Sequence, residues 1–131
     1  PLYDALYQIM GAEAFQKNME KGLIEVAPLA YMRGRTLDNA YIILDEAQNT
    51  TPEQMKMFLT RIGVNCRACV CGDFTQIDLP RGVPTGLKDA IRVLDGVEGI
   101  RIVSLNDSDI VRNSLVARIV KAYENAKQGD L

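Results

Sequence analysis

Two adjacent carboxylates and a downstream amide are the side chains that point most directly to chemistry. Asp45 and Glu46 follow the apolar run Tyr41–Leu44, and Gln76 comes shortly after a second apolar run, Ala68–Gly72. Burying charge without a partner is costly, so two carboxylates at the end of a strand call for a ligand. A Mg²⁺-nucleotide is one such ligand. The first carboxylate orders the metal's ligands, and the second positions or deprotonates an attacking water.

Each of these residues also has a simpler interpretation. Four apolar residues followed by Asp-Glu have the form of a Walker B motif, but the same letters describe a strand that ends in a solvated acidic turn. A short motif by itself does not decide between the two. Gln76 is able to sense a terminal phosphate or orient a water, or it is a turn residue that bonds to local backbone.

Four segments are predicted to be strands. Tyr41–Leu44 is expected to be buried on both faces of a parallel sheet, because its apolar run is continuous. The carboxyl end of such a strand is where open α/β folds bind ligands. The remaining predicted strands are a short one at Leu23–Ala27, one at Ala68–Gly72 and a third core strand at Ile100–Leu105.

Helices are predicted between these strands, and they have clear start and stop signals. Residues 2–20 read as two helices interrupted by Gly11, with Gly22 as a cap. Thr51-Pro52-Glu53-Gln54 is a capping-box start for a helix that runs to about Ile62. Further helices are predicted over Gly86–Leu94 and from about 111–114 to 126, the last with an inward-facing apolar stripe. The alternation of strands and helices predicts an α/β fold with a mainly parallel sheet.

Composition sets bounds on the class of protein. The length of 131 residues predicts one domain. The net charge of −2 provides no global basic footprint, so composition alone does not support nucleic-acid binding. No apolar run approaches the roughly 20 residues needed to span a bilayer, and no signal peptide is visible. We therefore expect a cytoplasmic protein without a membrane partner.

The cysteines and two arginines are weaker candidates for a site. Cys66, Cys69 and Cys71 are a poor disulfide framework, and the chain has no histidine or second ligand pair to complete a metal site. Cys69 and Cys71 are expected to share one strand face as small buried apolar residues. Arg33 and Arg35 could meet a phosphate or a carboxylate, although solvated surface arginines are commoner.

Long runs of this sequence resemble the PhoH-like ATPase family. The resemblance covers essentially the whole chain, and its motifs are long and specific. They are APLAYMRGRTL (27–37), ILDEAQNTTPEQMKMFLTRIG (43–63), GDFTQIDLPRG (72–82), GLKDAIRVLDGVEGI (86–100) and DIVRNSLVARIVKAYE (109–124).

The resemblance implies a three-layer α-β-α, RecA-like P-loop NTPase that binds ATP and Mg²⁺. Asp45 then corresponds to the Walker B aspartate that supports the metal, and Glu46 to the catalytic glutamate. Gln76 is similar to a sensor glutamine that reads the γ-phosphate. Arg112 corresponds to an arginine that acts as a sensor or as a finger across a subunit boundary. The resemblance to this family also implies a link to RNA metabolism, a nuclease partner and a homo-oligomer. In RecA-like proteins such an oligomer is often a ring.

One element of that family is absent from the sequence. No G-x₄-G-K-[ST] run occurs in the 131 residues, so the backbone amides and lysine that cradle phosphates are missing. In the family this P-loop lies upstream, and its strand sits between those at 69–71 and 100–105. We therefore expect one ATPase domain over 1–131, incomplete at its N-terminus and inactive alone. The alternative function is a non-catalytic docking or assembly module.

Overall fold

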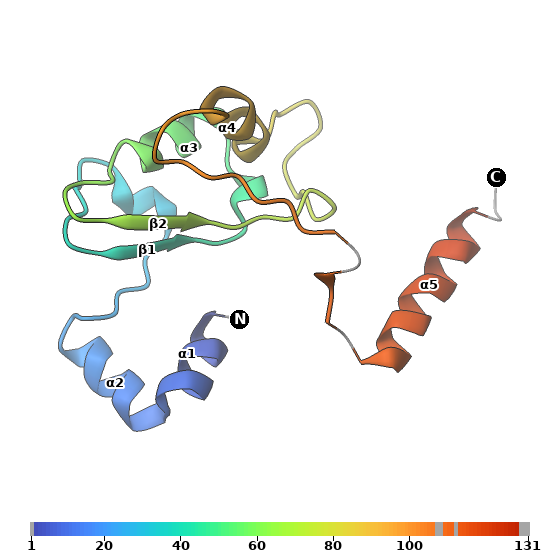
Figure 1. Ribbon diagram of the computed structural model, residues 1–131, viewed down its shortest axis with the longest axis horizontal. Helices are drawn as coiled ribbons and strands as arrows, with labels where there is room; N and C mark the ends of the chain where they lie inside the picture. Colours follow the sequence, from blue (N-terminus) through green and yellow to red (C-terminus); the bar gives the residue numbers. More distant parts are fainter. Residues whose placement is uncertain (1, 107–108, 112, 129–131) are drawn as a thin grey trace. The chain divides into compact units, whose positions relative to one another are not determined.

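The computed structural model describes residues 2–106, 109–111 and 113–128. The chain divides into two compact units, Pro1–Leu94 and Asp95–Leu131. The second unit contains one long helix, α5 (Ser114–Gln128). The first unit contains the other elements (Figure 1): α1 (Leu2–Met10), α2 (Ala12–Glu20), η1 (Leu29–Met32), β1 (Tyr41–Leu44), η2 (Ala47–Asn49), α3 (Pro52–Leu59), β2 (Arg67–Val70) and α4 (Gly86–Leu94), where η marks a 3-10 turn.

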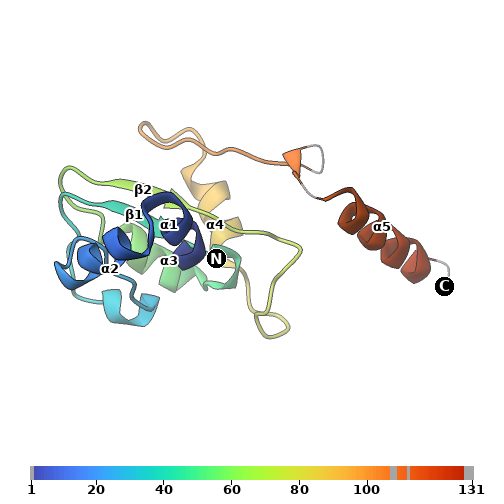
Figure 2. The same ribbon diagram turned by 90° about the horizontal axis from the view of Figure 1, so that it is seen from below.

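The two strands form a parallel sheet, which confirms the predicted α/β class. β1 and β2 are adjacent in both views (Figures 1 and 2), with Tyr41 paired to Arg67 and Leu44 to Val70. Parallel strands need a crossover connection, and α3 is the helix in that crossover. Both strands therefore point the same way and deliver their carboxyl ends to one edge of the sheet.

The core of the first unit lies on one side of this sheet. Figure 1 shows α3 and α4 on the same side of the strands. Its most buried members are Ala47, Met55 and Leu87, against which Leu44, Leu59, Val70, Ala90 and Ile91 pack. Side chains alternate between the faces of a strand, so one set in β1 points away from the helices. Tyr41 and Ile43 are 70% and 46% exposed. The prediction that β1 is buried on both faces is therefore wrong for the described residues.

The start of α3 follows the predicted capping box. The Thr51 side chain accepts a hydrogen bond from the Gln54 backbone N–H, and the Gln54 side chain accepts one from the Thr51 backbone N–H. Pro52 occupies the first turn, where its missing N–H is not needed. These bonds satisfy donors that every helix start leaves open, so the sequence signal and the structure agree.

The end of α3 comes earlier than predicted. The helix stops at Leu59 rather than near Ile62. The reason is a competing partner, because Leu37 and Ile62 form a parallel β-bridge. The Leu37 N–H donates to the Arg61 carbonyl at 2.8 Å, and the Gly63 N–H donates to the Leu37 carbonyl at 2.7 Å. The backbone after the helix is thus engaged by the segment that leads into β1.

The predicted strand Leu23–Ala27 is absent. The N–H groups of Leu23 and Ile24 both bond to the Asn18 carbonyl, so they close the end of α2 rather than join a sheet. Gly22, with a φ of 69°, supplies the left-handed turn expected of a helix cap. Leu23 and Val26 are 73% and 52% exposed, so this apolar segment has no core to pack against among the described residues.

The predicted core strand Ile100–Leu105 is also absent. Its residues have no regular secondary structure, and Val103 and Leu105 are 70% and 80% exposed. A strand needs a neighbour to satisfy its backbone groups, and the described sheet contains only β1 and β2. Helix α5 forms as predicted, but its apolar stripe, for example Leu115 at 55% and Tyr123 at 72%, is exposed rather than packed inward.

Helices α1 and α2 meet at Gly11, as predicted. Gly11 has a φ of 80°, and this conformation breaks the helix. The rings of Tyr3 and Tyr7 contact Phe15, with centroid separations of 5.6 and 4.5 Å. These contacts bury Phe15 to 4% exposure. Within the described part of the chain, each helix is too short or too polar to cross a membrane.

Candidate functional site

Asp45 and Glu46 lie at the carboxyl end of β1, where the ladder with β2 continues for one more step. The Cys71 N–H donates to the Leu44 carbonyl at 2.9 Å, and the Ala47 N–H donates to the Cys71 carbonyl at 2.9 Å. This register places Asp45 beside Cys71. Both carboxylate residues are exposed, so they are open to a ligand at the edge of the sheet.

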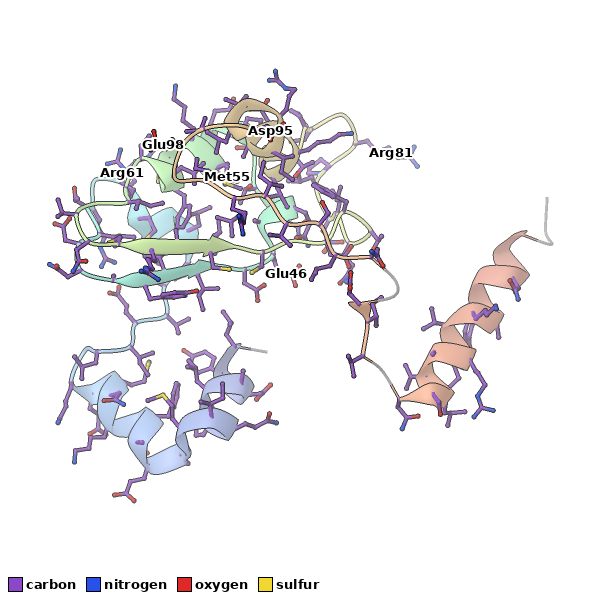
Figure 3. All side chains as sticks on the ribbon, in the orientation of Figure 1. Glu46, Met55, Arg61, Arg81, Asp95 and Glu98 are labelled. Atoms are coloured by element: carbon purple, nitrogen blue, oxygen red, sulfur yellow. The ribbon has the colours of Figure 1, made fainter. Side chains whose placement is uncertain are left out.

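Glu46 occupies a backbone conformation that is rare for its residue type. Its φ and ψ of 54° and 36° are left-handed, and the residue directly precedes η2. The Glu46 N–H donates to the Asp45 carboxylate oxygen Oδ1 at 3.0 Å. Non-glycine residues seldom adopt this conformation, and it clusters at functional sites. The turn keeps two consecutive carboxylates at the edge of the sheet, as Figure 3 shows for Glu46.

A buried glutamine joins the two predicted polar segments. Gln48 is fully buried, at 0% exposure. Its Nε2 donates to the Glu46 carboxylate and, at 3.2 Å, to the backbone carbonyl of Gln76. Its Oε1 accepts from the Asp73 N–H at 3.0 Å. The structure thus brings Glu46 and the segment around Gln76 together through a residue to which the sequence patterns gave no role.

The burial of Gln48 has no clear sequence signal. Gln48 lies in the 3-10 turn η2, where neither a 3.6-residue nor a 2-residue apolar period applies. Its backbone carbonyl accepts from the buried Thr85 hydroxyl at 2.6 Å. The position of Gln48 after two carboxylates is a sequence feature that could have suggested a polar network, but it was given no role. Both polar atoms of this amide side chain have hydrogen-bond partners, and these bonds offset the free-energy cost of burying them.

The Gln76 side chain is held by its own turn. Its Nε2 donates to Asp73 Oδ2 at 2.8 Å. The other oxygen of Asp73 accepts from the backbone N–H and hydroxyl of Thr75, at 2.8 and 2.7 Å. Gln76 is therefore linked to Glu46 by its own backbone carbonyl and the Gln48 amide. Between the described side chains of Gln76 and Glu46 there is no direct hydrogen bond. The phosphate-sensing role of Gln76 stays a prediction.

Gly72 permits this close packing. A Cβ at this position would lie 2.5 Å from Leu87 Cδ2, 2.9 Å from Gln48 Oε1 and 3.1 Å from the Gln48 backbone nitrogen. A side chain would therefore push against both the hydrophobic core and the hydrogen-bonding amide. Glycine at position 72 is thus a steric requirement of the Gln48 network as well as part of the predicted motif.

Arg33 and Arg35 lie away from this edge of the sheet. Arg35 forms a two-pronged ion pair with Glu25, with N–O distances of 2.7 and 3.0 Å. The hydrogen bond and the charge of Arg35 lower the pKa of Glu25. Arg35 was expected to meet a phosphate or a carboxylate, and in the structure it meets the carboxylate of Glu25. Arg33 lines a surface hollow beside η1 and α3. Arg112 lies outside the described residues.

The donor chemistry of the edge fits a magnesium ion. Asp45 and Glu46 offer hard carboxylate oxygens, which Mg²⁺ prefers. Within the described residues, no group of three or more His, Cys, Asp or Glu side chains is arranged to hold a metal. Magnesium is commonly bound by one or two carboxylates together with phosphates and waters rather than by an all-protein cage. Asp45 and Glu46 are therefore chemically suited to supply oxygen ligands to a magnesium ion, although they would not complete its coordination by themselves.

A family model for PhoH-like proteins matches residues 1–124 of this chain. The chain belongs to the PhoH-like protein family. The PhoH-like protein of Bacillus subtilis is 58% identical over 124 residues, which cover 95% of this chain and 39% of that relative. The PhoH-like protein of Mycobacterium tuberculosis is 58% identical over 94% of the chain, and Protein PhoH of Escherichia coli is 51% identical over 94%. The chain spans 35% of the length of each of these two relatives.

Proposed function

We propose that this chain supplies the Walker B half of a Mg²⁺-dependent ATP-hydrolysing site. The observation that carries the proposal is the link from Glu46 through buried Gln48 to the Gln76 backbone, at the carboxyl ends of β1 and β2. Ligand sites of open α/β sheets lie at this edge. The resemblance of the motifs to the PhoH-like ATPase family supports the same function.

Each residue of the edge has a specific role in this proposal. Asp45 holds the metal, whose charge neutralises the phosphate groups of the nucleotide. Glu46 orients the attacking water and accepts its proton, and Gln48 keeps the Glu46 carboxylate in place. Gln76 reads the γ-phosphate, which requires its side chain to leave Asp73. Two roles are proposed for Arg112, a sensor or a finger across a subunit boundary.

The remaining parts of the site would come from elsewhere in the longer protein. The relative from Bacillus subtilis is matched over 39% of its length, and the 131 residues contain no glycine-rich phosphate-binding loop. On this proposal, an additional strand pairs beside β2 and completes a three-layer, RecA-like sheet. That strand would also give residues 100–105 a neighbour. A homo-oligomeric ring, an RNA substrate and a nuclease partner belong to the same proposal.

The test uses the full-length protein that contains this chain. Glu46→Gln should abolish ATP hydrolysis and leave ATP binding intact, because the substitution keeps the side chain's size and removes its capacity to accept a proton. Glu53→Gln, an exposed glutamate on α3, is the matched control and should hydrolyse ATP normally. Full activity in Glu46→Gln would sink the assignment of Glu46.

Two further measurements separate the competing functions. The 131-residue chain alone should bind ATP weakly, because it lacks a phosphate cradle, and a tight Mg²⁺-dependent isotherm would contradict this. If the full-length protein hydrolyses no ATP, with or without RNA, the non-catalytic docking or assembly module becomes the better explanation.

A further inference from the structure

Glu46 and Gln76 each have a protein partner that fixes where the side chain lies. The Glu46 carboxylate accepts a hydrogen bond from the Gln48 amide. The Gln76 side chain donates to Asp73 Oδ2 at 2.8 Å, and it must give up that bond before it can read a phosphate. The proposed γ-phosphate sensor therefore has a closed state, with Gln76 on Asp73, and an open state, with Gln76 on its ligand.

The Gln76 side chain helps to close the turn that carries it. The backbone bond across this turn, from the Gln76 N–H to the Asp73 carbonyl, is 3.2 Å long, at the weak end of the range for N–H···O bonds. The side-chain bond to Asp73 is shorter and has a charged acceptor, so it is the stronger of the two. Loss of the side-chain bond should therefore let the Gln76 backbone shift.

The Gln48 amide ties the backbone of this turn to Glu46. Its nitrogen has two hydrogens, and they are donated to the Glu46 carboxylate and the Gln76 backbone carbonyl. Its oxygen accepts from the Asp73 N–H at 3.0 Å. Because the amide group is planar, it turns as one unit, and a shift of the Gln76 carbonyl changes the direction of the hydrogen that is bonded to Glu46.

Gln48 has little room to absorb such a shift by itself. Its side chain is at 0% exposure, and its backbone carbonyl accepts from the Thr85 hydroxyl at 2.6 Å. A Cβ at Gly72 would lie only 2.9 Å from Gln48 Oε1. These contacts all lie inside the first unit, so they do not depend on which outer faces are covered in the longer protein.

We propose that Gln48 is a relay that couples the release of Gln76 from Asp73 to the position of the Glu46 carboxylate. This inference rests on the proposed ATP-hydrolysing function and adds its regulation. Glu46 takes up its position on the attacking water only when Gln76 has exchanged Asp73 for the γ-phosphate. Gln48 is then a positioning residue, because it acts through Glu46, and the Asp73–Gln76 turn is the two-state element that such coupling requires.

The first measurement is native-state hydrogen exchange on the nucleotide-free full-length protein. Gln76→Met removes the side-chain bond to Asp73 and keeps the backbone carbonyl that Gln48 contacts. The reporter is the Asn49 N–H, which donates to the Glu46 carbonyl at 3.0 Å. Its protection should fall about 5- to 150-fold, the usual range for coupled sites. With Gln48→Met already present, adding Gln76→Met should change it by less than about twofold.

A matched control and a second variant accompany this measurement. Arg81 is exposed on the same loop and points away from the sheet in Figure 3. Arg81→Met should therefore leave the Asn49 N–H as protected as in the parent. Gln48→Asn repeats the test with an amide that is too short to span its partners, and circular dichroism checks that each variant is folded.

The second measurement is steady-state ATP hydrolysis by the same variants. Gln48→Met should lower kcat and leave KM within about twofold, because a residue that only positions Glu46 contributes little to binding of the nucleotide. Residues that act as a unit have strongly non-additive effects. The double variant of Gln48→Met and Gln76→Met should therefore be no more than about twofold slower than the slower single variant.

The outcomes separate the relay from the proposed function. Unchanged Asn49 protection in Gln76→Met overturns the relay, and so does an equal loss with and without Gln48. Losses of kcat that multiply in the double variant overturn it as well, while the ATPase assignment stands. A parent protein that hydrolyses no ATP overturns the proposed function instead, and hydrogen exchange still decides whether Gln48 couples the turn to Glu46.

Discussion

Replacing Gln48 by methionine should loosen the edge of the sheet at a specific place. Methionine is similar in length to glutamine but has neither an amide donor nor a carbonyl acceptor. The substitution removes the side-chain bonds to Glu46, Gln76 and Asp73. Gln48 is at 0% exposure, so water cannot enter its position without displacing packed neighbours.

The expected size of the effect follows from these three bonds. A neutral hydrogen bond contributes about 1 kcal/mol, and a bond to a charged group about 1.5–3 kcal/mol. Glu46 and Gln76 are themselves exposed, so solvent replaces part of what they lose. We therefore take the low end, about 3 kcal/mol in total. This is a roughly 100-fold change in the equilibrium for local opening, at 1.4 kcal/mol per tenfold.

Native-state hydrogen exchange reads this effect at single amides. The Asp73 N–H, which donates to Gln48 Oε1, should lose roughly 100-fold of its protection in Gln48→Met. Asn49→Ala is the control, since the Asn49 side chain accepts from the Asp78 N–H at 2.7 Å. That variant should expose Asp78 and leave Asp73 protected. Equal protection of Asp73 in Gln48→Met and the parent would refute the role of Gln48 as the link.

Two other predictions follow from individual contacts. Arg35→Gln should raise the pKa of Glu25 back toward its ordinary value in an NMR titration. Because the folded-state pKa of Glu25 is lowered, this pair stabilises the protein above the ordinary pKa of glutamate, and the contribution disappears as the pH falls through the lowered value. Gly86→Ala should lower the free energy of unfolding by about 1–3 kcal/mol in urea denaturation, because its Cβ would lie 2.3 Å from the Thr51 carbonyl oxygen. The exposed control Lys88→Ala should change stability by less than about 0.5 kcal/mol, and equal losses in the two variants would contradict the steric argument.

Local sequence signals predicted the elements whose causes are local. The capping box at Thr51 and Gln54 and the helix break at Gly11 depend on residues within one or two turns. The parallel pairing of β1 and β2 followed from an apolar run on each side of a helix, a pattern that admits few other topologies. For these features, nearby residues contain most of the information.

The predictions that failed concern features whose structure depends on residues far away in the sequence. The segments at 23–27 and 100–105 are apolar enough for strands, but a strand also needs a neighbour with free hydrogen-bonding groups. The early end of α3 arises from Leu37, more than 20 residues upstream of Ile62. Cys69 and Cys71 share a face as predicted but are exposed rather than buried, because burial depends on what covers that face.

The candidate site also combines features that the local sequence predicted with features that depend on distant contacts. Asp45, Glu46 and Gln76 were selected by residue type and by their place after apolar runs, and the structure brings their segments to one edge. Gln48 was missed because its role depends on contacts about 25 residues away, with Asp73 and Gln76. No periodicity within a turn reports a contact of that kind.

The left-handed backbone of Glu46 separates the demands of folding from those of the proposed catalysis. Residues other than glycine, asparagine and aspartate cost about 1–2 kcal/mol in this conformation, so glutamate is strained at this position. Asparagine or glycine would relieve that strain, but either would also lose the bond, worth about 1.5–3 kcal/mol, that buried Gln48 donates to the Glu46 carboxylate. Because the two effects offset each other, a library screened only for thermal resistance should tolerate substitutions at Glu46, and a library screened for turnover should reject them. Tolerance in the first screen and rejection in the second is the pattern of a residue retained for the proposed catalysis rather than for folding.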